Sequence, residues 1–157
     1  WYHSGDIGEF DEDGLLHIID RKKNILELYI DGRSVWFAIA PLEEVIIQST
    51  KVSNAFIYGD RNEGYVIAIV VADEEFLKKR KDEKKMTDEQ IEKEVLDDLQ
   101  QKVKAADFPD YAIPRGVVIE RTPWTVGNGM VTANGKLKRH ALLEKYNLAI
   151  HVKIQTL

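Results

Sequence analysis

Four consecutive charged residues, Asp20-Arg21-Lys22-Lys23, place the strongest constraint on how this chain can fold. They separate two largely apolar runs, Leu15–Ile19 and Ile25–Leu26. Because charged side chains are costly to bury without partners, the chain has to return to solvent at this point. The stretch is either a charged turn between two strands or a boundary between two packed units. We predict a boundary, with a linker segment at residues 1–22 and a folded unit at residues 23–157.

The segment before the boundary is predicted to form a two-stranded hairpin. Strands are expected at Ile7–Phe10 and Leu15–Ile19, joined by the turn Asp11–Gly14, whose last residue suits a positive φ. A hairpin of two strands is only marginally stable alone, so it needs a partner surface and should otherwise be loosely held. Because the sequence opens on Trp1-Tyr2 without an initiator methionine, we expect a fragment of a larger protein that supplies this surface.

The unit after the boundary is predicted to mix short strands and helices. Tyr65–Ala72 is continuous and rich in β-branched residues, which indicates the central strand of a sheet. Thr87 and Gln90 match a capping box, and apolar residues follow at every fourth position. Regular βαβ alternation is lacking, so the predicted fold class is α+β, with a short mixed sheet flanked by helices. The apolar stripe of the capped helix consists of Ile91, Val95, Leu99 and Val103.

The other elements follow from local patterns in the sequence. A solvated charged loop is expected at residues 81–85 and an extended link between Pro109 and Pro114, while the tail Ile150–Leu157 has no assigned structure. Further strands are expected at Val35–Ile39, Val52–Tyr58 and Val117–Ile119, further helices at Leu42–Ser49 behind Pro41, from Asp73 to Arg80 and at Arg139–Tyr146, and turns at Asp31–Arg33 and Arg61–Gly64.

Composition limits the range of partners. With 44% hydrophobic and 31% charged residues the chain is typical of globular proteins, and its net charge of −5 argues against a general nucleic-acid binder. The absence of cysteine excludes disulfides and thiolate metal sites and fits a cytoplasmic location. No apolar run is long enough to span a bilayer. The basic run Lys78–Lys81 is interpreted as a solvated helix end, with peripheral contact to an anionic membrane as the alternative.

Two residues lie at turns where their side chains can carry chemistry. Asp6, in Ser4-Gly5-Asp6, places a carboxylate where a ribose diol could donate to it, the alternative being an ordinary Asx-turn. Lys136 follows the tight turn Asn134-Gly135 and is a mobile cation suited to phosphate or carboxylate oxygens, the alternative being an exposed hairpin lysine. No metal site is predicted, because no histidine has metal-ligand spacing to another ligand. The four histidines are His3, His17, His140 and His151.

Together with the boundary stretch, these motifs resemble the C-terminal part of enzymes of the adenylate-forming (ANL) superfamily. The chain is most similar to long-chain fatty acyl-CoA synthetases, through Asp20–Ile25, Tyr58-Gly59-Asp60 and Asn128–Thr132. The resemblance covers about residues 1–146 and rests on the combination of motifs in order. The matching segments are Trp1–Gly8, Asp13-Gly14, Ile19–Ile25, Ala40–Glu43 and Thr132–Arg139.

The resemblance implies an ATP-dependent acyl-CoA ligase, of which this chain is the C-terminal lid domain. In that family ATP, used with Mg²⁺, and a fatty acid form an acyl-adenylate, from which coenzyme A then displaces AMP. Asp6 would bind the ribose hydroxyls, and Arg21 would contact the nucleotide near its ribose and phosphate. Lys136 would reach the carboxylate and the α-phosphate during adenylation. Lys23 would be the hinge about which the lid rotates between the two steps, and the loop after it would guide coenzyme A.

The chain also departs from the family pattern. The segment between Asn24 and Pro41 is longer than usual and carries Ser34–Phe37 in place of the expected sequence, which affects the expected coenzyme A contacts. The phosphate loop, the adenine site and the acyl pocket belong to the large N-terminal domain, so the chain alone is predicted to be inactive.

Two alternatives to the ligase remain open. One is a non-catalytic ligand-binding or interaction module of the same fold, and the other is an unrelated α+β module. The presence of Asp6, Arg21 and Lys136 together favours the enzyme. The unrelated module would place Lys136 and Arg21 far apart with no shared face.

Overall fold

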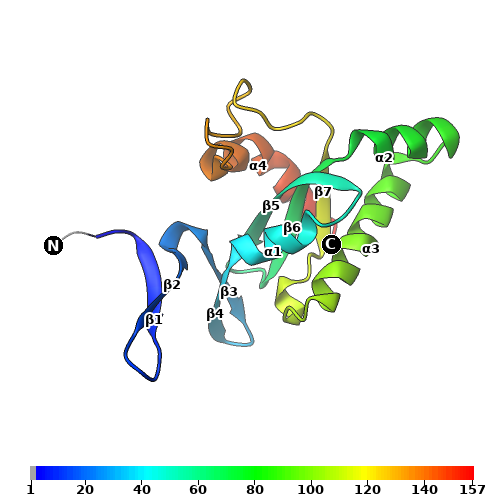
Figure 1. Cartoon of the computed structure of the whole chain (residues 1–157). Helices are drawn as coiled ribbons and strands as arrows, with labels where there is room; N and C mark the ends of the chain where they lie inside the picture. The colour runs from blue at the N-terminus through cyan, green and yellow to red at the C-terminus, as the bar shows by residue number, and fades with distance from the viewer. Residues whose placement is uncertain (1–2) are drawn as a thin grey trace.

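The computed structural model describes residues 3–157 (Figure 1). Its strands form a three-stranded sheet and two separate two-stranded hairpins. The elements are β1 (Asp6–Phe10), β2 (Leu16–Arg21), β3 (Ile25–Ile30), β4 (Arg33–Ala38), α1 (Ile39–Ile46), β5 (Val52–Asp60), β6 (Tyr65–Ala72), α2 (Glu74–Lys78), α3 (Asp88–Ala105), β7 (Gly116–Glu120) and α4 (Arg139–Gln155).

The three-stranded sheet is mixed and has the order β5-β6-β7. β5 runs antiparallel to β6, and β7 runs parallel to β6 after a connection that contains α2 and α3. A parallel pair requires such a crossover, and a helix is its usual form. The prediction that Tyr65–Ala72 is the central strand is confirmed, and so is the α+β fold class with a small mixed sheet.

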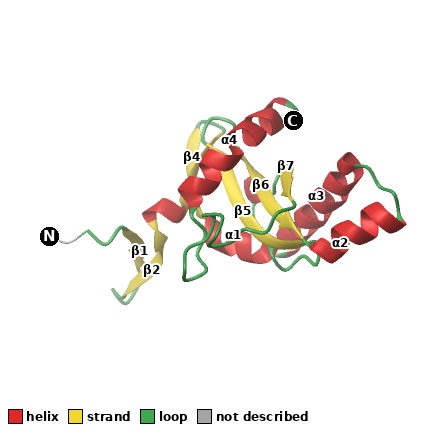
Figure 2. Ribbon diagram, turned by 90° about the horizontal axis from the view of Figure 1, so that it is seen from above, coloured by secondary structure: helices red, strands yellow, loops and turns green. Residues whose placement is uncertain are grey.

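Helices cover both faces of this sheet, which explains why β6 has no polar face (Figure 2). Even-numbered residues of β6, from Val66 to Val70, belong to the core shared with α1 and α3. Odd-numbered residues, from Tyr65 to Val71, belong to the core shared with α4. All eight residues of the strand are buried.

The capping box at the start of α3 forms as predicted. The Thr87 hydroxyl accepts from the Gln90 backbone N–H, and the Gln90 side chain accepts from the Thr87 backbone N–H. These two bonds satisfy donors that the first turn of a helix leaves free. All four residues of the predicted apolar stripe are buried against the sheet.

The C-terminal helix is longer than predicted. α4 continues past Tyr146 to Gln155, so most of the tail that had no assigned structure is helical. Leu142, Tyr146 and Ile150 are buried four residues apart, so the buried stripe extends into that tail. Because the polar residues of α4 are scattered around its circumference, the stripe could not be recognised without the sheet against which it packs.

Two predicted loops contain helical turns. The charged loop expected at residues 81–85 overlaps a π-helical turn at Lys79–Glu83. There Arg80 donates to Glu94 in a two-bond contact and stacks over Phe76, so the basic run is not wholly a solvated helix end. The link between the two prolines contains the 3-10 turn Asp110–Ala112, where Ala112 is fully buried.

The β3–β4 hairpin belongs to the folded unit. Its two-residue turn, Asp31-Gly32, has positive φ at both positions, the pattern of a tight hairpin turn. Leu28 is fully buried in the core, and the Tyr29 backbone N–H donates to the Arg61 carbonyl in the β5–β6 turn. The segment in which the sequence departs from the family is therefore an ordered hairpin.

The β1–β2 hairpin projects from the N-terminal side of the molecule (Figure 1). Its two strands pair only with each other, and Gly14 has the positive φ expected at the turn. The hairpin leaves a set of large apolar side chains exposed, namely Phe10, Leu15, Leu16, Ile18 and Ile19. Within residues 3–157, no helix combines the length and the apolar content needed to cross a bilayer.

Candidate functional site

A cavity of about 1000 Å³ lies where three parts of the chain meet. The walls come from the end of β2 with the turn after it, from Glu43 of α1, and from the loop before α4 with the first turns of that helix. Arg21 and Lys136 both line this cavity although they are far apart in the sequence. If the chain were an unrelated α+β module, Arg21 and Lys136 were expected to lie far apart with no shared face, and this expectation is wrong.

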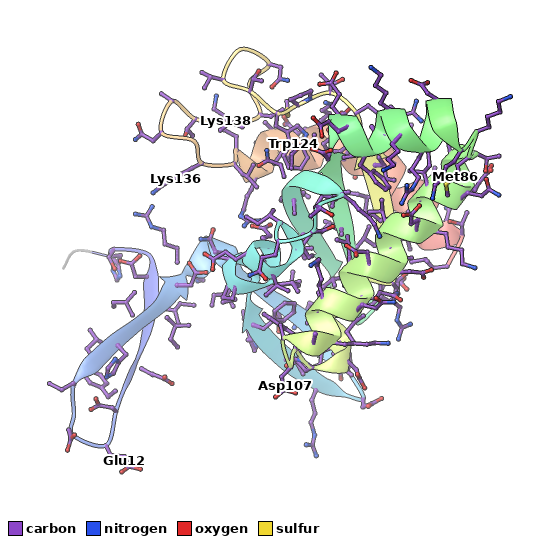
Figure 3. The ribbon with its side chains drawn as sticks, turned by 45° about the vertical axis from the view of Figure 1, so that its right-hand side comes forward. Glu12, Met86, Asp107, Trp124, Lys136 and Lys138 are labelled. Atoms are coloured by element: carbon purple, nitrogen blue, oxygen red, sulfur yellow. The ribbon has the colours of Figure 1, made fainter. Side chains whose placement is uncertain are left out.

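Lys136 is presented by a loop that is built from backbone hydrogen bonds. The Thr132 N–H donates to the Lys136 carbonyl at 2.8 Å, and the Gly135 N–H donates to the Thr132 carbonyl at 2.9 Å. Gly135 has a φ of 78°, which glycine adopts without strain. The predicted tight turn is confirmed, and the Lys136 side chain is exposed at its end (Figure 3). Among the described residues, no carboxylate pairs with its ammonium group.

Asp6 and Arg21 face each other across the β1–β2 ladder. They are paired in register, and the Arg21 Nε lies 3.7 Å from Asp6 Oδ1. Arg21 lines the main cavity and also a neighbouring hollow of about 580 Å³ beside Ser4 and Gly5. Asp6 itself lines neither space, but it contacts Arg21, which lines both.

The turn that follows Arg21 is fixed by the side chain of Asp20. Its Oδ1 accepts from the Arg21 backbone N–H at 2.6 Å and from Asn24 Nδ2 at 2.9 Å. The Lys22 N–H donates to the Gly5 carbonyl, which connects the turn to the start of β1. Lys23 lies inside the short 3-10 turn Lys22–Asn24, and its side chain lies outside the described part of the structure.

An ion pair in the cavity wall was not anticipated from the sequence. Arg139 Nη1 donates to Glu43 Oε1 at 2.9 Å, and Arg139 Nη2 donates to Oε2 at 2.6 Å. The Arg139 guanidinium also lies over the Phe56 ring, 5.5 Å from its centroid. Both charged residues belong to the matching motifs noted above, but nothing in the spacing of the two motifs indicates that they touch.

Basic side chains outnumber acidic ones in the lining of the cavity. Besides Arg21, Lys136 and Arg139, the residues Lys138 and His140 line it. The two carboxylates in its wall, Asp20 and Glu43, already accept hydrogen bonds from neighbouring groups. A space bordered in this way favours an anionic ligand. No group of three or more side chains that could hold a metal ion occurs in the described part of the chain.

Comparison with known proteins adds family information. A family model described as "AMP-binding enzyme C-terminal domain" matches residues 41–126. The chain is 34% identical to "Fatty acyl-CoA synthetase B" of Dictyostelium discoideum over 155 residues, which is 93% of this chain and 22% of the relative. It is 30% identical to "Long chain acyl-CoA synthetase 8" of Arabidopsis thaliana, over 93% of this chain and 21% of the relative.

Solved structures agree with this assignment. The adenylation domain of the carboxylate reductase from Mycobacterium chelonae matches with a TM-score of 0.83 and 30% identity, over 96% of this chain and 22% of that one. The chain spans less than a quarter of the length of each of these proteins. The resemblance to the adenylate-forming superfamily is confirmed, and the matched domain covers more than half of the 157 residues. This chain therefore belongs to the family of AMP-binding enzyme C-terminal domains.

Proposed function

We propose that the protein to which this chain belongs is an ATP-dependent acyl-CoA ligase. It activates a fatty acid, of long chain length by analogy with the relatives, as an acyl-adenylate, and then transfers the acyl group to coenzyme A. The observation that carries the proposal is the presence of Arg21 and Lys136 in one cavity whose lining holds more basic than acidic side chains. The names of the relatives, fatty acyl-CoA and long chain acyl-CoA synthetases, support it.

In the first half-reaction, Lys136 is the proposed catalytic residue. A carboxylate oxygen of the fatty acid attacks the α-phosphorus of ATP, a new P–O bond forms, and the bond to pyrophosphate breaks. The attack brings two anions together, and an ammonium group between them stabilises the crowded transition state. The Lys136 ammonium suits this role because it extends from a turn into a cavity shared with Arg21, with no carboxylate partner among the described residues.

Asp6 and Arg21 are the proposed nucleotide-binding residues. A carboxylate can accept hydrogen bonds from both ribose hydroxyls, and a guanidinium can donate to phosphate oxygens. The 3.7 Å between Arg21 Nε and Asp6 Oδ1 is long enough that either group can exchange this contact for a ligand. Mg²⁺ binds through substrate phosphates and one or two carboxylates, so it would enter the site with ATP.

In the second half-reaction, the lid rotates about Lys23 and the thiol of coenzyme A attacks the acyl carbon, so that AMP leaves. We propose residues 1–22 as the end of the large N-terminal domain and residues 23–157 as the lid. The exposed apolar side chains of β1 and β2 support this division, because they need a surface to cover them. The large domain would supply that surface, the acyl pocket and the phosphate loop. A cytoplasmic location, with or without peripheral membrane contact, stays a prediction from the sequence.

A second candidate is the adenylating part of a carboxylate reductase. This candidate is supported by the carboxylate reductase adenylation domain, which has the same fold as this chain at a TM-score of 0.83. A non-catalytic interaction module is the other alternative and would form no acyl-adenylate at all. Supplying coenzyme A to the full-length protein with ATP and a fatty acid distinguishes these cases, because only the ligase releases acyl-CoA.

The test of the lysine is to separate the two half-reactions in the full-length protein. Lys136→Ala should slow acyl-adenylate formation by at least about a hundredfold, which is within the range for loss of one group that stabilises developing charge. The rate is measured as the release of pyrophosphate. Thioester formation from supplied acyl-adenylate should change little, because Lys136 has moved away by then. An equal loss in both half-reactions would contradict the lid mechanism.

The hinge is tested by the complementary substitution. Lys23→Pro fixes φ at the proposed pivot and should block thioester formation while leaving adenylation near its normal rate. An enzyme that performs both half-reactions normally with proline at this position would place the pivot elsewhere in the chain.

A further inference from the structure

The ion pair between Glu43 and Arg139 joins elements on opposite faces of the sheet. Glu43 comes from α1, which packs on one face, and Arg139 is the first residue of α4, which packs on the other. The two residues meet at β5, which is the edge strand next to β6. Glu43 Oε1 accepts from the Ile57 backbone N–H of that edge at 2.9 Å, as well as from Arg139. One carboxylate thus satisfies an edge-strand donor and holds the start of α4.

This contact is largely removed from solvent and is geometrically specific. The Glu43 side chain is 12% exposed and that of Arg139 is 21% exposed. Two parallel N–H···O bonds between a guanidinium and a carboxylate fix both distance and orientation. The Phe56 ring under the guanidinium limits its movement further. The N-terminal end of α4 is therefore held at one place against α1 and β5.

The position of Lys136 depends on this end of α4. Lys136 precedes Arg139 by three residues, and the intervening chain is fixed by the Lys138 N–H, which donates to the Met130 carbonyl at 2.9 Å. The Leu142 N–H in turn donates to the Lys138 carbonyl, so the loop and the helix form one continuous hydrogen-bonded unit. A shift of Arg139 would therefore be transmitted to Lys136.

We propose that Glu43 and Arg139 are positioning residues that set the location of the Lys136 ammonium group for adenylation. The proposal rests on the proposed function of Lys136. Neither residue is required to touch the substrate, because Glu43 accepts from Arg139 and Ile57, and Arg139 donates both of its contacting nitrogens to Glu43. We call the Glu43–Arg139 ion pair the clamp. Displacement of a reacting group by about 1 Å can lower the rate by two orders of magnitude, so loss of the clamp should impair the step that uses Lys136.

The experiment compares Glu43→Gln, Arg139→Lys and the double variant in the full-length protein, with Lys136→Ala alongside. Glu43→Gln keeps an acceptor for the Ile57 N–H but loses the charge, and Arg139→Lys keeps the charge but loses the two-bond geometry. The matched control is Glu94→Gln. Glu94 accepts two hydrogen bonds from Arg80 with similar exposure, 25% and 17%, but neither residue lines the cavity. Measured are Tm, kcat and KM for ATP in adenylation, and thioester formation from supplied acyl-adenylate.

Each single variant of the clamp should lower kcat for adenylation by about tenfold or more, corresponding to the coupling energies found for residues that touch. The KM for ATP should stay within about twofold, and thioester formation should be unchanged. The double variant should be no slower than the slower single variant, because both act through one contact. Glu94→Gln should lower Tm about as much as Glu43→Gln does, but it should leave the rate of adenylation unchanged.

Three results would overturn the proposal. Glu43→Gln could slow adenylation no more than Glu94→Gln, which would make the pair purely structural. Arg139→Lys could raise the KM for ATP while Glu43→Gln does not, which would make Arg139 a direct nucleotide ligand. The losses in the double variant could also multiply, which would mean independent roles. If Lys136→Ala itself leaves adenylation intact, the proposed function fails; if only the clamp variants are normal, the positioning role alone fails.

Discussion

Replacing Glu120 with glutamine should destabilise the chain at pH 7 by about 2 kcal/mol, because Glu120 anchors the connection between β7 and α4. Its Oε2 accepts from Lys145 Nζ at 2.6 Å and from the Tyr146 hydroxyl at 2.5 Å. The Tyr146 oxygen accepts in turn from the buried Trp124 Nε1 at 2.8 Å. Glu120 Oε1 accepts from the backbone N–H groups of Arg121 and Thr122. A glutamine can keep only part of this acceptor set.

The magnitude follows from the ionisation of Glu120. Burial opposes its charged form, but the hydrogen bonds from Lys145, Tyr146 and the backbone N–H groups of Thr122 and Arg121 together outweigh burial and lower the pKa of Glu120 from 4.5 to about 2. At about 1.4 kcal/mol per tenfold change in the ionisation constant, this corresponds to about 3 kcal/mol. The Lys145 side chain is 35% exposed, so solvent screening reduces the value to about 2 kcal/mol. Because the pKa is lowered on folding, this contribution is present above pH 4.5 and is lost as the pH falls toward 2.

The assay is urea unfolding of the chain, followed by tryptophan fluorescence, at pH 7 and at about pH 3. The difference between wild type and Glu120→Gln should be full at pH 7 and should narrow below pH 4.5. Glu144→Gln is the control: Glu144 adjoins Lys145 in α4 but is 70% exposed, so it should change stability by less than about 0.5 kcal/mol. Equal stability of Glu120→Gln and wild type at pH 7, or a difference that does not depend on pH, would refute the reasoning.

Three further substitutions test a helix cap and a turn. Thr87→Ala removes the capping box of α3 and should cost about 1 kcal/mol, seen as a lower urea midpoint with an unchanged slope; an unaffected midpoint would mean that the cap is not important for stability. Gly64→Ala should be more destabilising than Gly32→Ala by about 1 kcal/mol or more, because both have positive φ but only the Cβ at Gly64 would lie 2.9 Å from the Tyr29 carbonyl oxygen. Equal losses would show that the β5–β6 turn can move away from β3.

Features that depend on neighbouring residues were predictable from the sequence. The capping box and the four-residue stripe of α3 formed as expected, since both depend on helical geometry alone. The turn that presents Lys136 was also predicted, because Asn-Gly favours positive φ. The extent of α4 was not, because its buried stripe is defined by the sheet and not by segregation of polar residues along the helix.

Contacts between distant residues had no local signal. Glu43 and Arg139 are 96 positions apart, and an ion pair over that distance depends on how α1 and α4 pack around β5. The inward orientation of Arg80 toward Glu94 likewise required the placement of α2 beside α3, so composition alone indicated a solvated basic run.

By itself, the sequence determined the central strand, the capped helix α3 and the tight turn before Lys136, because charge, periodicity and turn preference are properties of short segments. Tertiary structure alone decided that Arg21 and Lys136 share a cavity and that Glu43 holds the start of α4. The physical reason is that side-chain pairs across a fold are selected by packing of whole elements, which no short segment encodes.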